Sequence, residues 1–354
     1  MHETPERMQV LTVTDPYRAE YKAVDIPPLE KDQILIRVRC TGICATDYSI
    51  YTGESSFVKD GLIRYPVRIG HEWAGVVEKT GEDVRSFRPG DRVYSDNGVS
   101  CGKCEECRKG NYYRCRHIRS VGTINCWDGS YAEYMIIPEY NLHHLPDCLT
   151  FEEGALIEPA SIALDAFEGF PLTKEDTVAV TGTGAIGMCA AWLAKYLGAG
   201  RVVMVGRNDK KLETARLIGA DEVINNVKES MTERLMELSD GKGIRQIVET
   251  TGAPEVLRES LKCIASHGRV SVAGFFEQDI DGIPIDRIVL KHQSIVGAAG
   301  HLGAAEKTCR IMTENPVSLL PLITHKIPFE QCGYVFEHFS DYSREKIKMM
   351  VEFQ

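Results

Sequence analysis

Residues 178–187 read VAVTGTGAIG, a short apolar run that passes into the pattern G-x-G-x-x-G and then into a helical sequence. A strand, this glycine pattern and a helix are typical of a loop that binds the pyrophosphate of a dinucleotide. Gly182 makes the tight turn, Gly184 lets the backbone approach the phosphates, and Gly187 lets the helix pack closely on the strand. The free N–H groups at the N-terminus of this helix favour a bound anion. The predicted cofactor-binding residues here are Gly182, Gly184, Ala185, Ile186 and Gly187. A glycine-rich turn in an enzyme that binds no nucleotide stays open as the alternative.

The sequence around this loop alternates short apolar runs with helical stretches. The apolar runs are TVAVTG (177–182), RVVMVG (201–206), IVETTG (247–252) and RVSVAG (269–274), with helical stretches at 185–199 and 209–220. This alternation predicts a doubly wound parallel sheet of Rossmann type. Before residue 174, runs such as DQILIRVRC (32–40) alternate polar and apolar residues between glycines and prolines, which indicates a compact, mostly β segment.

The length of 354 residues favours about two domains. We expect an α/β protein with one mostly-β catalytic domain and one Rossmann domain. The last fifty or so residues carry mixed signals, and we interpret them as returning to the first domain. The expected division is 1–160 with 301–354 for the catalytic domain and 161–300 for the dinucleotide-binding domain.

The residues after the second strand of the Rossmann segment bear on cofactor choice. NAD-dependent enzymes place a carboxylate there, about twenty residues past the glycine loop, to bind the adenine ribose. This chain has Gly206, Arg207 and Asn208, with lysines at 210 and 211. Arg207 offers a planar, permanently charged fork for a 2′-phosphate, so NADP is the predicted preference. In the alternative, Asp209 turns inward to hold NAD and Arg207 is a solvated residue.

A quartet of cysteines lies within one polar loop, CGKCEECRKGNYYRC. Its members, spaced C-x2-C-x2-C-x7-C, are Cys101, Cys104, Cys107 and Cys115. Four thiolates satisfy a closed tetrahedral zinc site, which would order a loop with little apolar content of its own. The site is predicted to be structural because it keeps no open coordination position. An iron–sulfur cluster and free core cysteines are the alternatives.

Three separated pieces complete the pattern: GICATD at 42–47, GHEWAG at 70–75, and IEP at 157–159. Each alone has an ordinary structural interpretation, such as a core thiol, a core histidine or a carboxylate at a helix start. Their joint presence, in this order with the quartet and the glycine loop, resembles the zinc-containing medium-chain dehydrogenases over essentially the full length. The resemblance is to the branch of sorbitol, other polyol and threonine dehydrogenases. It implies a GroES-like catalytic domain.

The resemblance implies a catalytic zinc site with Cys44, His71 and Glu72 as ligands or near-ligands and Glu158 as the variable ligand. Which carboxylate binds at rest stays open. Thr46 corresponds to the family's hydroxyl that bonds the substrate oxygen and begins the proton relay, and Asp47 either orients the site or caps a helix. Ala45 departs from the family's usual glycine. The predicted catalytic residues are therefore Cys44, Thr46, His71, Glu72 and Glu158.

The implied reaction is zinc-dependent hydride transfer between a secondary alcohol, either a polyol, a cyclitol or a sugar, and NAD(P). Oxidation of an amino alcohol, as by an L-threonine 3-dehydrogenase, is the runner-up, followed by a metal-free reductase and a non-catalytic dinucleotide-binding protein. Substrate contacts are expected from residues 51–65, residues 124–128 and His301.

The net charge of −10 argues against nucleic acid and anionic membranes as partners and favours a small molecule. No stretch reaches the length of about 18 apolar residues that a membrane span needs. A cytoplasmic location is expected, in which the twelve cysteines serve metal binding or packing rather than disulfides. The family resemblance implies a homodimer or homotetramer.

Overall fold

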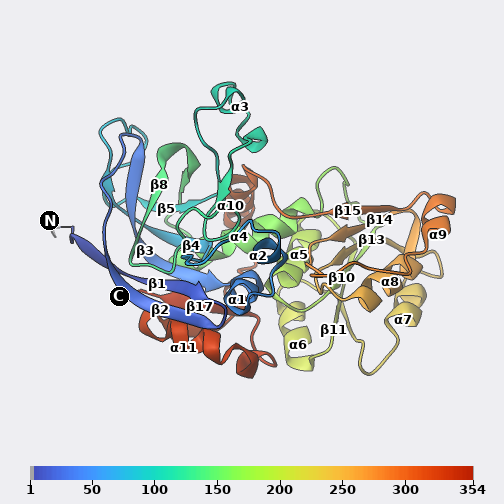
Figure 1. Cartoon of the computed structure of the whole chain (residues 1–354). Coiled ribbons are helices and arrows are strands. Elements are labelled where there is room, and N and C mark those ends of the chain that lie inside the picture. Colours follow the sequence, from blue (N-terminus) through green and yellow to red (C-terminus); the bar gives the residue numbers. More distant parts are fainter. Residues whose placement is uncertain (1–3, 354) are drawn as a thin grey trace.

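The computed structural model describes residues 4–353 and arranges them in two lobes, each built around its own sheet (Figure 1). The first lobe combines the N-terminal half, blue to green in Figure 1, with the red C-terminal segment. The second lobe is drawn in yellow-green to orange. The expected α/β class, with one mostly-β part and one parallel-sheet part, is confirmed.

The first lobe holds a seven-stranded sheet with the order β16-β17-β3-β4-β5-β9, and β8 pairs with β3. All pairs are antiparallel except the parallel pair of β16 and β17. Strands from the N-terminal half and from the C-terminal segment therefore meet in one sheet. Its strands are β3 (Gln33–Ile43), β4 (Glu72–Thr80), β5 (Arg92–Ser95), β8 (Tyr134–Pro138), β9 (Leu142–His144), β16 (Ile323–Pro328) and β17 (Lys348–Glu352). Two small sheets accompany it, β1 (Arg7–Asp15) with β2 (Arg18–Asp25) and β6 (Gly98–Val99) with β7 (Arg119–Ser120).

The second lobe holds a six-stranded, all-parallel sheet with the order β12-β11-β10-β13-β14-β15. Counted from its first strand, the order is 3-2-1-4-5-6, the arrangement of a doubly wound dinucleotide fold with its switch point between β10 and β13. The strands are β10 (Thr177–Thr181), β11 (Arg201–Gly206), β12 (Glu222–Asn225), β13 (Ile244–Glu249), β14 (Ile264–Val272) and β15 (Ser294–Gly297). The helices are α5 (Ala185–Tyr196), α6 (Asp209–Leu217), α7 (Met231–Leu238), α8 (Pro254–Cys263) and α9 (Ile285–Leu290).

Helix α4 (Phe151–Asp165) packs on β4 of the first lobe and on α5 of the second. It begins with a capping box, in which the Thr150 hydroxyl accepts from the Glu153 N–H at 3.1 Å and Glu153 Oε2 accepts from the Thr150 N–H at 3.0 Å. One apolar core runs through α4, α5 and β10. The lobes thus share buried surface, and the expected domain boundary at 160/161 falls inside this helix.

The remaining helices lie mostly in the first lobe and its C-terminal part. They are α1 (Ala45–Thr52), α2 (Ser56–Lys59), α3 (Glu105–Arg108), α10 (Ala304–Glu314) and α11 (Cys332–Glu337). Among the described residues, no helix has the length and apolar character to span a bilayer.

Candidate active site and metal centres

The N-terminus of α1 presents the first group of site residues. Cys44 is the N-cap residue that follows β3, and its N–H donates to Asp47 Oδ2 at 2.9 Å. Asp47 is fully buried, and its Oδ2 also accepts from the Tyr131 hydroxyl at 2.8 Å. Asp47 Oδ1 lies 3.2 Å from Nδ1 of His71. Asp47 therefore caps α1 and also lies within ion-pair distance of the imidazole.

His71 and Glu72 lie where the chain enters β4, next to Cys44. One ligand atom from each of Cys44, His71 and Glu72 lies within 4.8 Å of the other two. One thiolate, one imidazole and one carboxylate form a donor set that suits zinc. The structure brings together these three predicted ligands from separate parts of the sequence.

Glu72 has a buried ion-pair partner that was not predicted from the sequence. Lys348 on β17 donates to both Glu72 carboxylate oxygens, at 2.6 Å and 2.5 Å, and both residues are almost fully buried. Gly42 leaves the space for this carboxylate, because a Cβ there would lie 2.0 Å from Glu72 Oε2. The signal in the sequence was a single lysine inside the apolar run IKMMV.

Glu158 sits in the middle of α4, not at a helix start, and its carboxylate faces the same site. Its Oε1 accepts from Nδ2 of Asn97 at 2.5 Å. Glu158 is not one of the three residues whose ligand atoms converge within 4.8 Å. It lines the cavity beside them.

A cavity of about 310 Å³ joins these residues and reaches the second lobe. Thr46, Glu158 and Ile186 line it together with the three convergent residues. Of the segments expected near the substrate, Phe57, Ile124 and His301 line the cavity. The lining also includes residues that were not predicted from the sequence, among them Ser95, Asp96, Asn97, Ile118, Ser120, Thr123, Ile162, Phe275 and Leu302.

Burial and mutual charge shape the electrostatics of this site. Burial raises the pKa of Glu158 to about 7; His71 opposes the rise and Glu72 adds to it. Burial also disfavours the charged form of His71, but the attraction of Asp47 outweighs it and raises the His71 pKa well above its ordinary value. For Lys348, burial acts against the ammonium, and the Glu72 carboxylate overcomes it and raises the Lys348 pKa.

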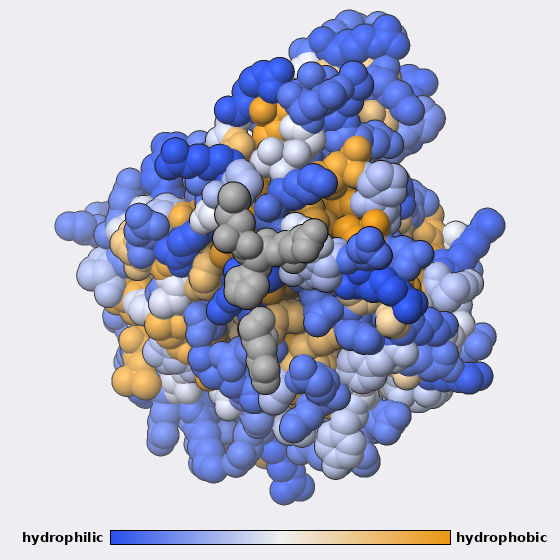
Figure 2. All heavy atoms as spheres, turned by 90° about the vertical axis from the view of Figure 1, so that its left-hand side faces the viewer, coloured by the Kyte–Doolittle hydropathy of each residue, from blue (hydrophilic) through white to orange (hydrophobic). Residues whose placement is uncertain are grey.

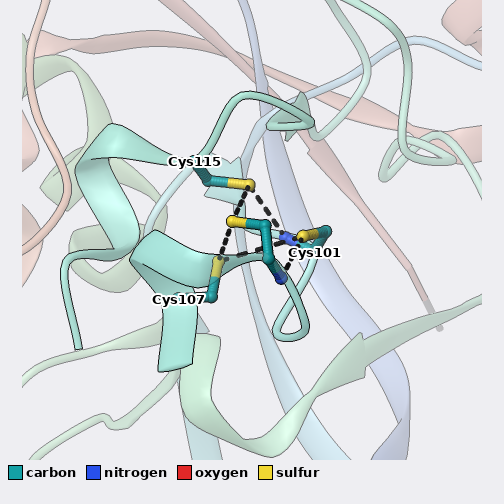
Figure 3. Close-up of side chains that lie close together, drawn as sticks. Cys101, Cys107 and Cys115 are labelled. Atoms are coloured by element: carbon teal, nitrogen blue, oxygen red, sulfur yellow. Dashed lines mark hydrogen bonds between the residues drawn. The ribbon is translucent and has the colours of Figure 1, made fainter. Parts of the chain in front are cut away.

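The cysteine quartet forms a separate cluster (Figure 3), in the loop that carries α3 and projects from the first lobe (Figure 1). Sγ of Cys104 lies 3.4 Å from that of Cys107 and 3.9 Å from that of Cys115, and Sγ of Cys101 lies 3.9 Å from that of Cys107. Four thiolates at about 2.3 Å from one tetrahedral zinc lie about 3.8 Å apart. The quartet therefore has the dimensions of a closed zinc site.

The loop that carries the quartet has little else to hold it. Among the described side chains of residues 101–117, only those of Cys107 and Cys115 are buried. Figure 2, in which this segment projects at the top, shows a mostly hydrophilic surface there. Backbone N–H groups of Cys104 and Cys101 donate to the sulfurs of Cys101 and Cys115, each at 3.3 Å, which favours thiolates. A metal would supply the cohesion that packing does not.

The glycine loop has the predicted shape between β10 and α5. Gly182 has a φ of 107°, and a Cβ on Gly187 would lie 1.9 Å from the Gly182 carbonyl oxygen, so this residue permits the close helix–strand contact. Around Gly184 a Cβ would meet nothing within 4 Å, which leaves the approach to the loop open. Ala185 and Ile186 begin α5. These residues present the helix N-terminus toward the cleft.

The end of β11 lies against the glycine loop. A Cβ on Gly206 would lie 2.4 Å from Cγ2 of Thr183, so the absence of a side chain at residue 206 leaves space for Thr183 of this loop. Arg207 is exposed. Asn208 caps α6, where its side chain accepts from the Lys211 N–H at 3.2 Å.

Comparison with known proteins agrees with this geometry. Residues 30–147 match the alcohol dehydrogenase GroES-like domain, and residues 185–313 match the zinc-binding dehydrogenase domain. The chain is 28% identical to sorbitol dehydrogenase of Bacillus subtilis, over 99% of this chain and 98% of that protein. It is 33% identical to L-threonine 3-dehydrogenase of Pyrococcus horikoshii, over 94% and 95%. The crystal structure of galactitol-1-phosphate dehydrogenase from Escherichia coli superposes with a TM-score of 0.86 at 26% identity, covering 98% and 100% of the two chains.

Proposed function

The chain belongs to the zinc-dependent alcohol and polyol dehydrogenases, and we propose that it oxidises a secondary alcohol with NADP as the preferred acceptor, at the cavity lined by Cys44, His71 and Glu72. In this reaction the alcohol loses its hydroxyl proton and a hydride, which yields a ketone, the reduced cofactor and a proton. The single observation that carries the proposal is the convergence of a thiol, an imidazole and a carboxylate in one cavity with the N-terminal end of α5.

Cys44, His71 and Glu72 are the proposed ligands of the catalytic zinc, and Glu158 is the exchangeable one. A bound zinc supplies Lewis acidity, which lowers the pKa of an alcohol. Lys348 contributes to the charge balance of the site. With Cys44, Glu72 and Glu158 ionised, a divalent ion would leave the site net negative, and the Lys348 ammonium beside Glu72 makes it neutral. Exchange of Glu158 against water or substrate then costs little charge separation.

The protein's own groups position the substrate and move its proton. The Thr46 hydroxyl lines the cavity, and we assign it the first acceptance of the substrate proton, since a hydroxyl donates and accepts at once. Asp47 holds the imidazole of His71 in a fixed orientation from the side away from the cavity. Cys101, Cys104, Cys107 and Cys115 are the proposed ligands of the structural zinc.

The proposed preference for NADP rests on two candidate contacts of the adenine ribose, Asp209 for NAD and Arg207 for the 2′-phosphate of NADP. Asp209, the carboxylate of the NAD alternative, is engaged elsewhere: its Oδ1 accepts from Asn225 Nδ2 and its Oδ2 pairs with Lys228, both at 2.7 Å. Arg207 is exposed directly after β11. Gly182, Gly184, Ala185, Ile186 and Gly187 are the proposed pyrophosphate contacts, with Gly206, Arg207 and Asn208 on the adenosine side.

A homodimer is proposed from the edge of the parallel sheet. β15 ends the sheet with Ile295 and Val296 exposed, and the adjacent α9 exposes Val289 and Leu290. An open edge strand with apolar neighbours is a pairing surface, and a second copy of the chain fits it by symmetry. Light scattering that gives the mass of a single chain would rule this out.

Location and domain division remain proposals as well. The cytoplasm, and a small molecule rather than nucleic acid or membrane as partner, follow from the net charge of −10 and the free cysteines. The division into 1–160 with 301–354, and 161–300, follows the two sheets.

The proposal is tested by a panel of secondary alcohols and polyols offered with NADP and with NAD, followed by the absorbance of the reduced cofactor. We expect alcohol-dependent reduction in protein that holds about two zinc ions per chain. A protein that holds this metal and reduces neither cofactor with any alcohol would contradict the proposal.

A further inference from the structure

A second cavity, of about 380 Å³, lies beside residues 61–68 of the first lobe. It shares no lining residue with the substrate cavity. The charged side chains in its lining are Arg64, Arg68 and Asp128. Two arginines against one carboxylate form a local excess of positive charge in a chain whose net charge is −10. The electrostatic character of the second cavity therefore favours an anion.

Arg68 lies in the wall of the second cavity with part of its guanidinium group unused. Its side chain is 11% exposed, and its Nη2 lies 2.5 Å from Asp128 Oδ2. Nε of Arg68 is buried and has no hydrogen-bond partner among the described residues. The Asp128 side chain is 68% exposed, so this ion pair is partly solvated and contributes little to stability. Because a guanidinium group can donate two parallel hydrogen bonds to one carboxylate or phosphate, an anion can compete with Asp128 for Arg68.

Two further arginines add positive charge around the same cavity. Arg64 is exposed, and its side chain forms no hydrogen bond or ion pair with the described residues. Arg119 donates from Nε to the carbonyl oxygen of Asn125 at 3.1 Å and from Nη2 to that of Cys126, and both acceptors belong to the lining. Burial raises the pKa of Cys126 to about 12, so this thiol stays neutral. Three arginines against one aspartate leave a net charge of +2, which matches a doubly charged anion.

Hydrogen-bonded backbone segments connect the second cavity to the substrate cavity. Leu62 and Ile63 line the second cavity, and their N–H groups donate to the carbonyl oxygen of Phe57 at 2.9 Å and 3.0 Å. The N–H of Asn125, also in this lining, donates to the Leu62 carbonyl oxygen at 2.9 Å. Phe57 and Ile124 line the substrate cavity. A shift of these segments on one side therefore reaches the wall of the other cavity.

We infer that the second cavity binds a small, doubly charged organic anion, either a phosphate monoester or a dicarboxylate, and that the bound anion changes how the alcohol binds in the substrate cavity. Arg64 and Arg68 are the anion contacts, and Asp128 competes with the anion for Arg68. The volume of about 380 Å³ leaves space for the carbon skeleton of such a molecule. The effect on the alcohol rests on the proposed dehydrogenase function, whereas the binding of the anion does not.

The first experiment measures binding by calorimetric titration of the zinc-loaded protein with ethyl phosphate and with succinate. Saturating NADP is present, so that the phosphate contacts of the cofactor are already occupied. Succinamide, which has the shape of succinate without its charge, is the control ligand. We expect at least one of the two anions to bind with a Kd of about 1 mM or lower, and the stronger one identifies the chemical class. A Kd above about 10 mM for both anions, or equal affinity for succinamide, would overturn the inference.

The second experiment assigns the binding to the second cavity through variants with opposite effects. Arg64→Gln should weaken the binding of the anion about ten- to a hundredfold, because a charge-assisted contact is lost. Asp128→Asn should strengthen it about two- to fivefold, because the competing carboxylate is removed. Arg88→Gln is the matched control, since Arg88 is an exposed arginine of the same lobe that lines neither cavity. An affinity that neither Arg64→Gln nor Asp128→Asn changes would overturn the site.

The third experiment tests the connection between the cavities by steady-state kinetics. A saturating concentration of the anion should change the KM of the alcohol about fivefold or more in the parent. The same concentration should have little effect in Arg64→Gln, whose turnover without the anion should equal that of the parent, because Arg64 does not line the substrate cavity. A KM that the bound anion leaves unchanged would overturn the connection.

The results distinguish this inference from the function proposed above. An enzyme that oxidises an alcohol but binds neither anion keeps the dehydrogenase function and loses the second site. A zinc-loaded protein that binds the anion through Arg64 but oxidises no alcohol keeps the second site and loses the dehydrogenase function.

Discussion

Lys348 on β17 lies with its Nζ 2.6 Å and 2.5 Å from the two carboxylate oxygens of Glu72 at the start of β4. The two residues are 276 positions apart, and both are nearly inaccessible to solvent. The pair joins the C-terminal strand of the chain to the candidate metal site. Its environment also makes each partner dependent on the other, since a buried charge without a partner is costly.

Lys348→Met should therefore lower the free energy of unfolding by about 3–5 kcal/mol, because it leaves the Glu72 carboxylate buried without its cation. Chemical denaturation checks this. The double variant Lys348→Met with Glu72→Gln removes both charges and should recover most of the loss. A single variant as stable as the parent would show that Glu72 does not depend on Lys348.

Cys104→Ser should weaken the binding of one zinc ion and lower the melting temperature, because Cys107 and Cys115 are the only buried residues among the described side chains of residues 101–117. Thermal unfolding and metal analysis measure the two effects. Turnover by the folded fraction should change little, as the quartet is separate from the cavity residues. Cys148→Ser, at an exposed cysteine outside both clusters, is the control. An unchanged melting temperature in Cys104→Ser would deny the quartet its structural role.

Arg207→Ala should reduce kcat/KM for NADP about ten- to a hundredfold and leave NAD almost unaffected, because a charge-assisted contact to the 2′-phosphate is lost. Steady-state kinetics with both cofactors on one alcohol decide the matter. Arg216→Ala, in the last turn of helix α6, which follows Arg207, serves as the control for charge alone. A parent enzyme whose kcat/KM for NAD equals or exceeds that for NADP would refute the assignment of a 2′-phosphate contact to Arg207.

Lys346 makes stability depend on pH. Burial lowers the pKa of this ammonium to about 7, with the charges of Lys211 and Lys348 adding to the effect. Between about pH 7 and the unfolded value near 10.4, the unfolded chain binds more protons than the folded one, so stability rises with pH. Lys346→Met should remove this part of the rise between pH 7 and pH 9 in urea denaturation. An identical pH dependence in parent and variant would contradict the lowered pKa.

Local patterns predicted four strands and two helices of the second lobe. The run RVVMVG forms β11 over the predicted residues, and the helical stretch at 185–199 contains α5. These elements succeed because glycine, apolar periodicity and capping are all local signals. Five elements of this lobe were not predicted: strands β12 and β15 and helices α7, α8 and α9. In β15 and α9 the exposed apolar residues carry no clear alternation.

The predicted residues of the site are those that lie in recognisable sequence motifs. Cys44, His71 and Glu72 meet because β3 and β4 pair antiparallel, with Gly42 opposite Glu72, a register that no local pattern specifies. Lys348 and Asn97 escaped prediction for the same reason: each acts through a contact between distant segments. Nearness in the sequence did not predict the partners of Asp209. It lies two residues after Arg207, but its carboxylate contacts Asn225 and Lys228.

The most direct test of the account is the turnover of His71→Ala with a secondary alcohol and NADP. His71 is a proposed zinc ligand in the first lobe, whereas the glycine loop belongs to the second. We predict that turnover is abolished and that the protein keeps about one zinc per chain, while it binds the dinucleotide with nearly the affinity of the parent. Turnover within about tenfold of the parent would contradict the account, because an enzyme that depends on this metal site loses far more when a ligand is removed.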